Sequence, residues 1–270
     1  MLLNKLRKTF AVTLRVNHKI IDVLDTQNQS LILIFYACGL KTMTDKQHRI
    51  KALICSVVTY LKAHRGCMSG VDITLDKLAG MNLSDERLID IPSQSTRHDE
   101  VLRNAIAGLV APELVEIAIC LKAAKDDLVW REDNAQFYQQ GADLGEGYTK
   151  CNLHTLLIGP DACGHYHPDF SLGIFMLGPR TLYRDHNHDA PELYVNLSEK
   201  SGWRFGTRDW KDYPAGSLIW NPSGAPHATR VYEQPFISVF VWLENVNSRC
   251  NLVQCDDWEG IEHELAGLGG

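Results

Sequence analysis

The sequence lacks the cysteine patterns that mark several specialised classes of protein. Its 270 residues include eight cysteines, but no two are spaced as Cys-x-x-Cys, which argues against a thiolate zinc ribbon and against thioredoxin-like redox chemistry. A chain of this length does not need disulfides to stabilise a core. We therefore interpret most of the cysteines as small buried residues in a reducing compartment.

Long apolar runs and an excess of positive charge are also absent. The longest apolar run, Leu31–Leu40, has ten residues, whereas a membrane-spanning helix needs about 20. The formal net charge is −6, so the chain carries no overall electrostatic footprint for nucleic acid. A basic N-terminus (Lys5, Arg7 and Lys8) is followed by Arg15 and Lys19, which interrupt the apolar core that a signal peptide would need. We expect a cytoplasmic protein that binds neither nucleic acid nor membrane.

Residues 1–126 have the pattern of a helical region. Apolar side chains recur at helical spacing over Asp45–His64 and again over Thr96–Lys125, where Pro112 is expected to interrupt the helix. Ile73–Asp90 has some features of a helix-turn-helix, but Leu83 stands where its turn usually has glycine. Together with the acidic charge, this disfavours DNA binding. The helical region is a candidate surface for a homodimer.

From residue 127 the pattern changes to short apolar runs separated by Gly-Pro, Pro-Ala-Gly and Pro-Ser-Gly turns, which is typical of a β-sandwich or barrel. We place this domain at residues 127–246 and expect residues 247–270 to form a polar surface tail. The predicted fold class is α+β, with a helical N-terminal region before a β-barrel. The predicted strands are 152–158, 172–177, 192–197, 202–205, 217–221, 227–232 and 236–243.

The most specific feature is the segment 185–194, which reads Asp-His-Asn-His-Asp-Ala-Pro-Glu-Leu-Tyr. On a strand, His186 and His188 point to the same face, and after a turn Glu192 and Tyr194 share a face as well. Two imidazoles and a carboxylate that converge predict a site for one divalent metal ion, which could be Fe, Zn, Mn or Ni. His227 offers a third imidazole.

Both segments resemble the two motifs of the cupin family, whose fold is a double-stranded β-helix, or jelly roll. His186, His188 and Glu192 fill the first motif, HxHxxxE. In the second, Gly216 is followed by Pro222, Gly224 and His227 at the family spacing, although Val231 stands where the family usually has Asn. A second pair, His165 and His167, has no carboxylate four residues later, and we interpret it as structural or as loop lining.

The surroundings are similar to the cupin-type dimethylsulfoniopropionate (DMSP) lyases. The resemblance covers residues 127–245 and includes Leu-Tyr-Arg-Asp-His at 182–186, Pro-Ala-Gly at 214–216 and Pro-His-Ala at 226–228. It implies a metal-dependent β-elimination of DMSP to dimethyl sulfide and acrylate. It further implies that His188, Glu192 and His227 are metal ligands, that His186 is a ligand or a neighbour that positions substrate, and that Tyr194 is the metal-proximal base. Tyr183 matches a second catalytic tyrosine of the pocket.

Elementary chemistry is consistent with those roles. A free tyrosine has a pKa of about 10, and a nearby divalent cation would favour its phenolate form. The sulfonium of the substrate is a cation without hydrogen-bond donors, so aromatic faces are suitable partners for it. Candidates for substrate binding are Trp203, Trp220 and Trp242, with Arg184 as a partner for a carboxylate. Trp130 and Tyr138 lie in a segment that we interpret either as a flap over the barrel mouth or as a linker.

Two other classes of function stay open at this point. Another metal-dependent cupin enzyme, such as an iron dioxygenase or a sugar-phosphate isomerase, would use the same ligands; the oxygenase would need ferrous iron and dioxygen, and the isomerase would need clustered Lys and Arg. A non-catalytic cupin would bind its ligand without turnover and would use the helical region as an output module.

Overall fold

The computed structural model describes residues 12–16, 19–23 and 43–268. The chain divides into two compact units, Met1–Thr44 and Asp45–Gly270. In the first unit, β1 (Val12–Val16) pairs antiparallel with β2 (Lys19–Val23). This hairpin corrects the prediction that the whole of 1–126 is helical. The apolar run 31–40 and the basic N-terminal residues lie outside the described residues.

The second unit begins with helices, as the apolar spacing predicted for 45–64 and for 96–125. They are α2 (Asp45–Ala63), α3 (Ser69–Ala79), α4 (Asp99–Ala107) and α5 (Val115–Ala124). Pro112 begins a short 3-10 helix, η2 (Pro112–Leu114), which separates α4 from α5 as expected. Further 3-10 helices are η1 (Asp85–Arg87) and η3 (Lys125–Asp127). Because α3 is followed only by the three-residue η1, the segment 73–90 has no recognition helix and is not a helix-turn-helix.

After a short helix, α6 (Glu146–Lys150), the chain forms two mainly antiparallel sheets that face each other as a barrel. One sheet has the order β10-β7-β12-β5-β3-β4 and the other the order β13-β6-β11-β8-β9. The seven predicted strands are all present, and the α+β class is confirmed. The strands are β3 (Asn152–Gly159), β4 (His165–Tyr166), β5 (Ser171–Leu177), β6 (Leu182–Asn187), β7 (Glu192–Asn196), β8 (Lys200–Phe205), β9 (Lys211–Pro214), β10 (Leu218–Asn221), β11 (His227–Arg230), β12 (Phe236–Trp242) and β13 (Asn251–Leu252).

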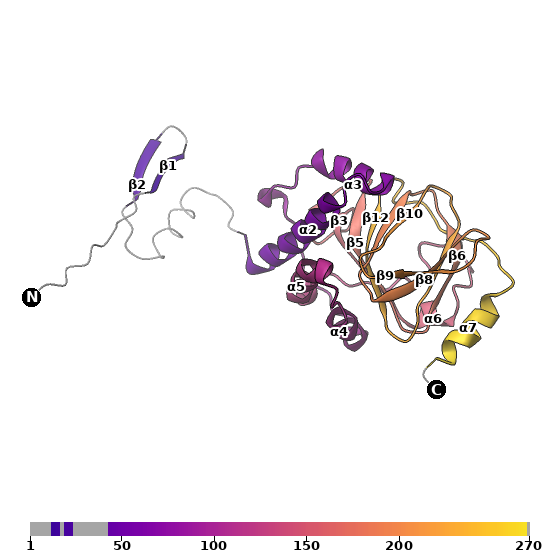
Figure 1. Ribbon diagram of the computed structural model, residues 1–270. Coiled ribbons are helices and arrows are strands. Elements are labelled where there is room, and N and C mark those ends of the chain that lie inside the picture. The colour runs from indigo at the N-terminus through magenta and orange to yellow at the C-terminus, as the bar shows by residue number, and fades with distance from the viewer. Residues whose placement is uncertain (1–11, 17–18, 24–42, 269–270) are drawn as a thin grey trace, which may run out of the picture. The chain divides into compact units, whose positions relative to one another are not determined.

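Both faces of the six-stranded sheet are covered. The helices α2 and α5 lie over its outer face (Figure 1), where alternate residues such as Ile174, Leu193 and Val239 join the helical core. The intervening residues, including Phe175, Tyr194 and Phe240, point into the barrel and form a second, aromatic core. Strand alternation therefore separates a structural face from a face that lines the barrel.

The C-terminal segment is part of the fold, which corrects the prediction of a polar surface tail. β13 pairs with β6, and α7 (Trp258–Ala266) packs Trp258, Ile261 and Leu265 against Leu182 on the outside of the barrel. The indole of Trp258 donates a 2.8 Å hydrogen bond to Asp185, a buried carboxylate that also forms an ion pair with Arg204. The apolar residues of 258–266 have helical spacing, but the segment is short and its surroundings are polar, so we did not predict a helix there.

Within the parts of the chain that the structure describes, no single helix has both the length and the apolar composition of a membrane span. The segments 99–107 and 112–127, which are bent relative to each other, meet the criteria of length and composition only when they are taken together.

The packing of α7 can be tested with Trp258→Ala. We expect the free energy of unfolding to fall by about 3 kcal/mol, because the substitution removes a buried aromatic ring and leaves a cavity. Urea denaturation of the variant measures this loss. The exposed neighbour Glu259 offers a control, since Glu259→Ala should stay within about 0.5 kcal/mol of the parent. Equal stability of the two variants would mean that α7 is a dispensable tail.

Candidate metal centre and cavity

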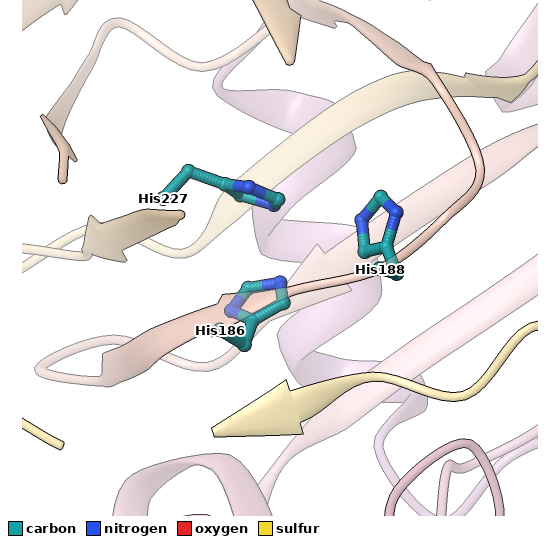
Figure 2. A group of neighbouring side chains, drawn as sticks. All are labelled: His186, His188 and His227. Carbon is teal, nitrogen blue, oxygen red and sulfur yellow. The ribbon is translucent and has the colours of Figure 1, made fainter. Parts of the chain in front are cut away.

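Three histidines from two neighbouring strands meet inside the barrel. His186 lies on β6, His188 follows the end of that strand, and His227 begins β11, where it is paired directly opposite His186. Their imidazoles point toward one another (Figure 2), and one ring nitrogen from each lies within 4.8 Å of the others. All three side chains are buried. This is the arrangement that the two sequence motifs predicted for a metal.

Backbone carbonyls hold each imidazole in one tautomer. Nδ1 of His186 lies 2.8 Å from the Arg184 carbonyl, Nδ1 of His188 lies 2.8 Å from that of Ala190, and Nδ1 of His227 lies 3.0 Å from that of Ala225. A carbonyl only accepts hydrogen bonds, so each neutral ring carries its proton on Nδ1 and presents the lone pair of Nε2 to the cavity. Metal-ligating histidines are oriented in the same way.

The turn between β10 and β11 places His227 beside His188. Gly224 has a φ of +72°, a conformation that glycine adopts without steric cost, and its amide donates a 2.9 Å hydrogen bond to the His188 carbonyl. Gly224, the glycine of the second motif, thus places His227 of that motif next to His188 of the first motif.

Glu192 completes the group from β7. Its Oε2 lies 3.3 Å from Nε2 of both His188 and His227, while its Oε1 accepts a 2.7 Å hydrogen bond from the indole of Trp242. The contact with His227 lacks hydrogen-bond geometry, so Nε2 of His227 is a buried nitrogen without a hydrogen-bond partner. Such an orphaned lone pair, next to a carboxylate and two further imidazoles, fits a bound divalent cation.

The electrostatics follow from burial and from these contacts. Burial opposes ionisation of Glu192, but His188 and His227 outweigh it and hold the pKa of this carboxyl well below its usual range. Burial also opposes protonation of His188, yet Glu192 raises its pKa. For His186, burial and the two neighbouring imidazoles hold the pKa well below the usual value. At neutral pH, His186 is therefore a neutral ligand candidate.

Tyr194 shares the inward face of β7 with Glu192, as strand alternation predicted. Both residues line a cavity of about 470 Å³, the volume of a small-molecule site, together with His186, His188 and Trp242. Burial and the Glu192 carboxylate raise the pKa of Tyr194 well above its usual value. A phenolate at this position therefore requires additional positive charge.

Tyr183 reaches the same cavity because of a β-bulge. Between the pairs His227–His186 and Thr229–Tyr183, β6 contains one residue more than β11. Regular alternation would send Tyr183 and His186 to opposite faces, but the bulge brings both inside, with ring centroids 4.2 Å apart.

The chain ahead of the barrel strands also lines the cavity, through residues that include Asp133, Tyr138 and Tyr148. The Tyr138 and Tyr183 hydroxyls are 2.7 Å apart, and the Tyr148 ring stacks on Tyr183 with a centroid separation of 4.7 Å. The hydroxyl of Tyr148 donates a 2.9 Å hydrogen bond to the buried Asp133. Asp133 and Tyr138 both belong to the segment 130–138, which we interpreted as a flap or a linker, whereas Tyr148 stands in no recognisable pattern.

Several predicted substrate-binding residues lie elsewhere. Trp220 faces outward from β10, with its ring against Gly70 of α3, and Arg184 forms ion pairs with Asp143 and Glu262 outside the barrel. These two predictions were wrong, because the register of β10 and the bulge of β6 direct both side chains away from the cavity. Trp130, the other end of the predicted flap, is buried in the helical core, where its indole donates to the Lys125 carbonyl.

Trp203 is inside the barrel but does not line the cavity. It is 1% exposed, its indole donates to the Ser201 hydroxyl, and its ring packs 5.1 Å from that of Tyr194. It supports Tyr194 rather than a substrate. Of the three tryptophans, only Trp242 lines the cavity, with its ring 4.6 Å from that of His188.

Sequence comparison matches residues 90–238, more than half of the chain, to the family described as dimethylsulfoniopropionate lyase. The chain is 30% identical over 104 residues to the dimethylsulfoniopropionate lyase DddQ of Ruegeria pomeroyi. That match covers 38% of this chain and 51% of the relative, so the chain spans about half the length of this curated protein.

Solved structures show the same fold. A structure from a study of the DMSP lyases RdDddP and RnDddQII superposes with a TM-score of 0.60 at 17% identity and covers 78% of this chain and 100% of its own. The crystal structure of the DMSP lyase DddQ from Ruegeria pomeroyi superposes with a TM-score of 0.56 at 20% identity and covers 78% of this chain and 98% of its own.

His154 on β3 also lines the cavity, and it predicts a pH dependence of stability. Burial and the nearby Arg131 lower the pKa of His154 to about 4. Between pH 6.5 and that value the unfolded chain binds more protons than the folded one, so the free energy of unfolding falls as the pH falls. We expect a loss of about 1 kcal/mol per pH unit within this window. Urea denaturation at pH 7 and pH 5 measures it.

His154→Gln provides the comparison, because every other titrating group is the same in both proteins. The variant should lose less stability than the parent between pH 7 and pH 5. An identical loss in the two proteins would show that His154 titrates normally in the folded state.

Proposed function

This chain belongs to the dimethylsulfoniopropionate (DMSP) lyase family, and on that premise we propose that it cleaves DMSP to dimethyl sulfide and acrylate by β-elimination. The observation that carries the proposal is that His186 and His188, which form one group with His227, line a single cavity together with Glu192 and Tyr194. An elimination next to a carboxylate needs an anion-binding centre and a base within reach of the same carbon, and this cavity provides candidates for both.

We further propose that the three histidines hold one divalent metal ion, with Glu192 as a fourth ligand. Fe, Zn, Mn and Ni all accept this donor set of imidazoles and one carboxylate. Neutral histidines and one ionised glutamate leave the loaded site with a charge of about +1. A bound ion would thus supply the positive charge that the substrate carboxylate and a Tyr194 phenolate both need.

In the proposed reaction, Tyr194 takes the proton from the carbon next to the carboxylate. The electron pair of that C–H bond forms the new double bond of acrylate, and the C–S bond to the next carbon breaks. Its electron pair leaves with sulfur, so the cationic sulfonium departs as neutral dimethyl sulfide. Trp203 packs against Tyr194, and the indole of Trp242 holds Glu192, so both tryptophans position the groups that act.

Tyr183 has a different role from Tyr194 in this proposal. Its ring lies against His186 and its hydroxyl is engaged with that of Tyr138, so it forms part of the cavity wall. A phenol in this position orients the substrate and excludes water from the reacting carbon.

The activity is tested by headspace gas chromatography of dimethyl sulfide, after purified protein of known metal content is mixed with DMSP. We expect release that stops when a chelator removes the metal and returns when a divalent metal is added back. Metal-loaded protein that releases no dimethyl sulfide would contradict the proposed activity and would leave only the metal-site proposal standing.

The base is tested by Tyr194→Phe, which keeps the ring and removes the hydroxyl. We expect kcat to fall by about two to four orders of magnitude, as for the loss of a general base, with unchanged metal content. Tyr166→Phe is the matched control, since Tyr166 is 65% exposed on β4 and lies outside the cavity. Turnover close to that of the parent in Tyr194→Phe would assign the proton transfer to another group.

A further inference from the structure

Asp133 is a carboxylate buried in the wall of the cavity. It is 5% exposed, and it precedes the barrel strands in the segment that leads to Tyr138. Its Oδ1 accepts a 2.9 Å hydrogen bond from the amide of Gln136, and its Oδ2 accepts the 2.9 Å hydrogen bond from Tyr148. These hydrogen bonds fix the position of the carboxylate, but the groups that donate them are neutral.

No basic side chain forms an ion pair with Asp133 in the part of the chain that the structure describes. Arg131 and Arg249 also line the cavity, but Arg131 donates to the Asp161 carbonyl and Arg249 to the Tyr138 carbonyl. Buried carboxylates are rarely left without a counter-ion, because the loss of hydration is unfavourable for an ion. Both guanidinium groups are thus held on backbone carbonyls, and Asp133 has no ion-pair partner among the described residues.

Aromatic rings surround the same part of the cavity. The rings of Tyr148 and Tyr183 are stacked, and Tyr138 stands edge-on to Tyr148 with centroids 6.3 Å apart. An ammonium could donate hydrogen bonds to a carboxylate, whereas a sulfonium or a quaternary ammonium cannot. A cation without donors is instead stabilised by a negative charge and by contact with aromatic rings. Asp133 supplies the charge, and the tyrosines beside it supply the rings.

We propose that Asp133, together with Tyr148 and Tyr183, binds the cationic end of the substrate and makes the site selective for sulfonium over neutral acids. The proposal rests on the proposed function, because it assigns the second charged end of the same zwitterion. Two ring contacts, Tyr148 to Tyr183 and Tyr183 to His186, separate the carboxylate from the three histidines. With a divalent ion bound as proposed, the two ends of the cavity would offer opposite charges to the two ends of the substrate.

The chemistry of the step predicts which kinetic constant Asp133 affects. The positive charge on sulfur disappears as the C–S bond breaks, so the attraction to Asp133 is greatest in the bound substrate and weaker in the transition state. An interaction of this kind lowers KM without raising kcat. Asp133→Asn should therefore raise KM for DMSP at least tenfold, while kcat stays equal to that of the parent or rises.

The decisive experiment compares two ligands of the same shape, 3-(trimethylammonio)propionate and its neutral carbon analogue 4,4-dimethylpentanoate. Isothermal titration of the metal-loaded protein gives both dissociation constants. We expect the parent to bind the cationic ligand at least tenfold more tightly, and Asp133→Asn to bring the ratio close to one. Asparagine keeps an acceptor for the Gln136 amide, so the turn should be preserved, and circular dichroism checks that the variant is folded.

Asp161→Asn is the matched control, because Asp161 also lines the cavity but is exposed. It should leave the ratio unchanged. A ratio near one in the parent would overturn the proposal without any variant, and so would an unchanged ratio in folded Asp133→Asn. Since the titration measures binding alone, a protein that releases no dimethyl sulfide would refute the proposed activity, while the ratio of dissociation constants would still test the role of Asp133.

Discussion

The direct pairing of His186 with His227 across β6 and β11 is the contact on which the rest of the site depends. It sets two imidazoles side by side before any other interaction is made, and it leaves His188, just beyond the end of β6, to approach from the third side. The carbonyl groups that accept from Nδ1 then orient every Nε2 toward one point. Because these contacts are made by the backbone, the three imidazoles are oriented by the barrel itself.

Burial on both sides of the six-stranded sheet explains how the barrel holds this centre. The helices cover the outer face of β5, β7 and β12, so the apolar side chains of this sheet are buried on that side. The interior is then free to carry polar and aromatic groups that a two-layer sandwich would have filled with aliphatic side chains. Trp203 and Phe236 still fill one end, and the cavity occupies the other.

The cavity combines charges that would be unfavourable if they were buried without partners. In the proposed metal-loaded state, the three imidazoles, Glu192 and the ion would form a positive pole. Asp133, with hydrogen bonds only from neutral donors, forms the negative one. Aromatic rings between the two poles keep the dielectric constant low, which strengthens the interaction of each pole with a ligand. A zwitterion is the kind of molecule that satisfies both at once, and this links the metal-site proposal to the proposed substrate.

The sequence by itself determined the class of fold and the central residues of the candidate metal site. Strand alternation and the spacing of His186, His188, Glu192 and His227 depend on local geometry and on two short motifs, so they can be read without knowing the partners of each strand. Tertiary structure decided the rest. The bulge in β6 brought Tyr183 inside and sent Arg184 out, strand register turned Trp220 toward α3, and the path of the chain before β3 placed Asp133, Tyr138 and Tyr148 on the cavity wall. These outcomes depend on pairing between strands and on packing between segments distant in sequence, and neither leaves a local pattern in the chain.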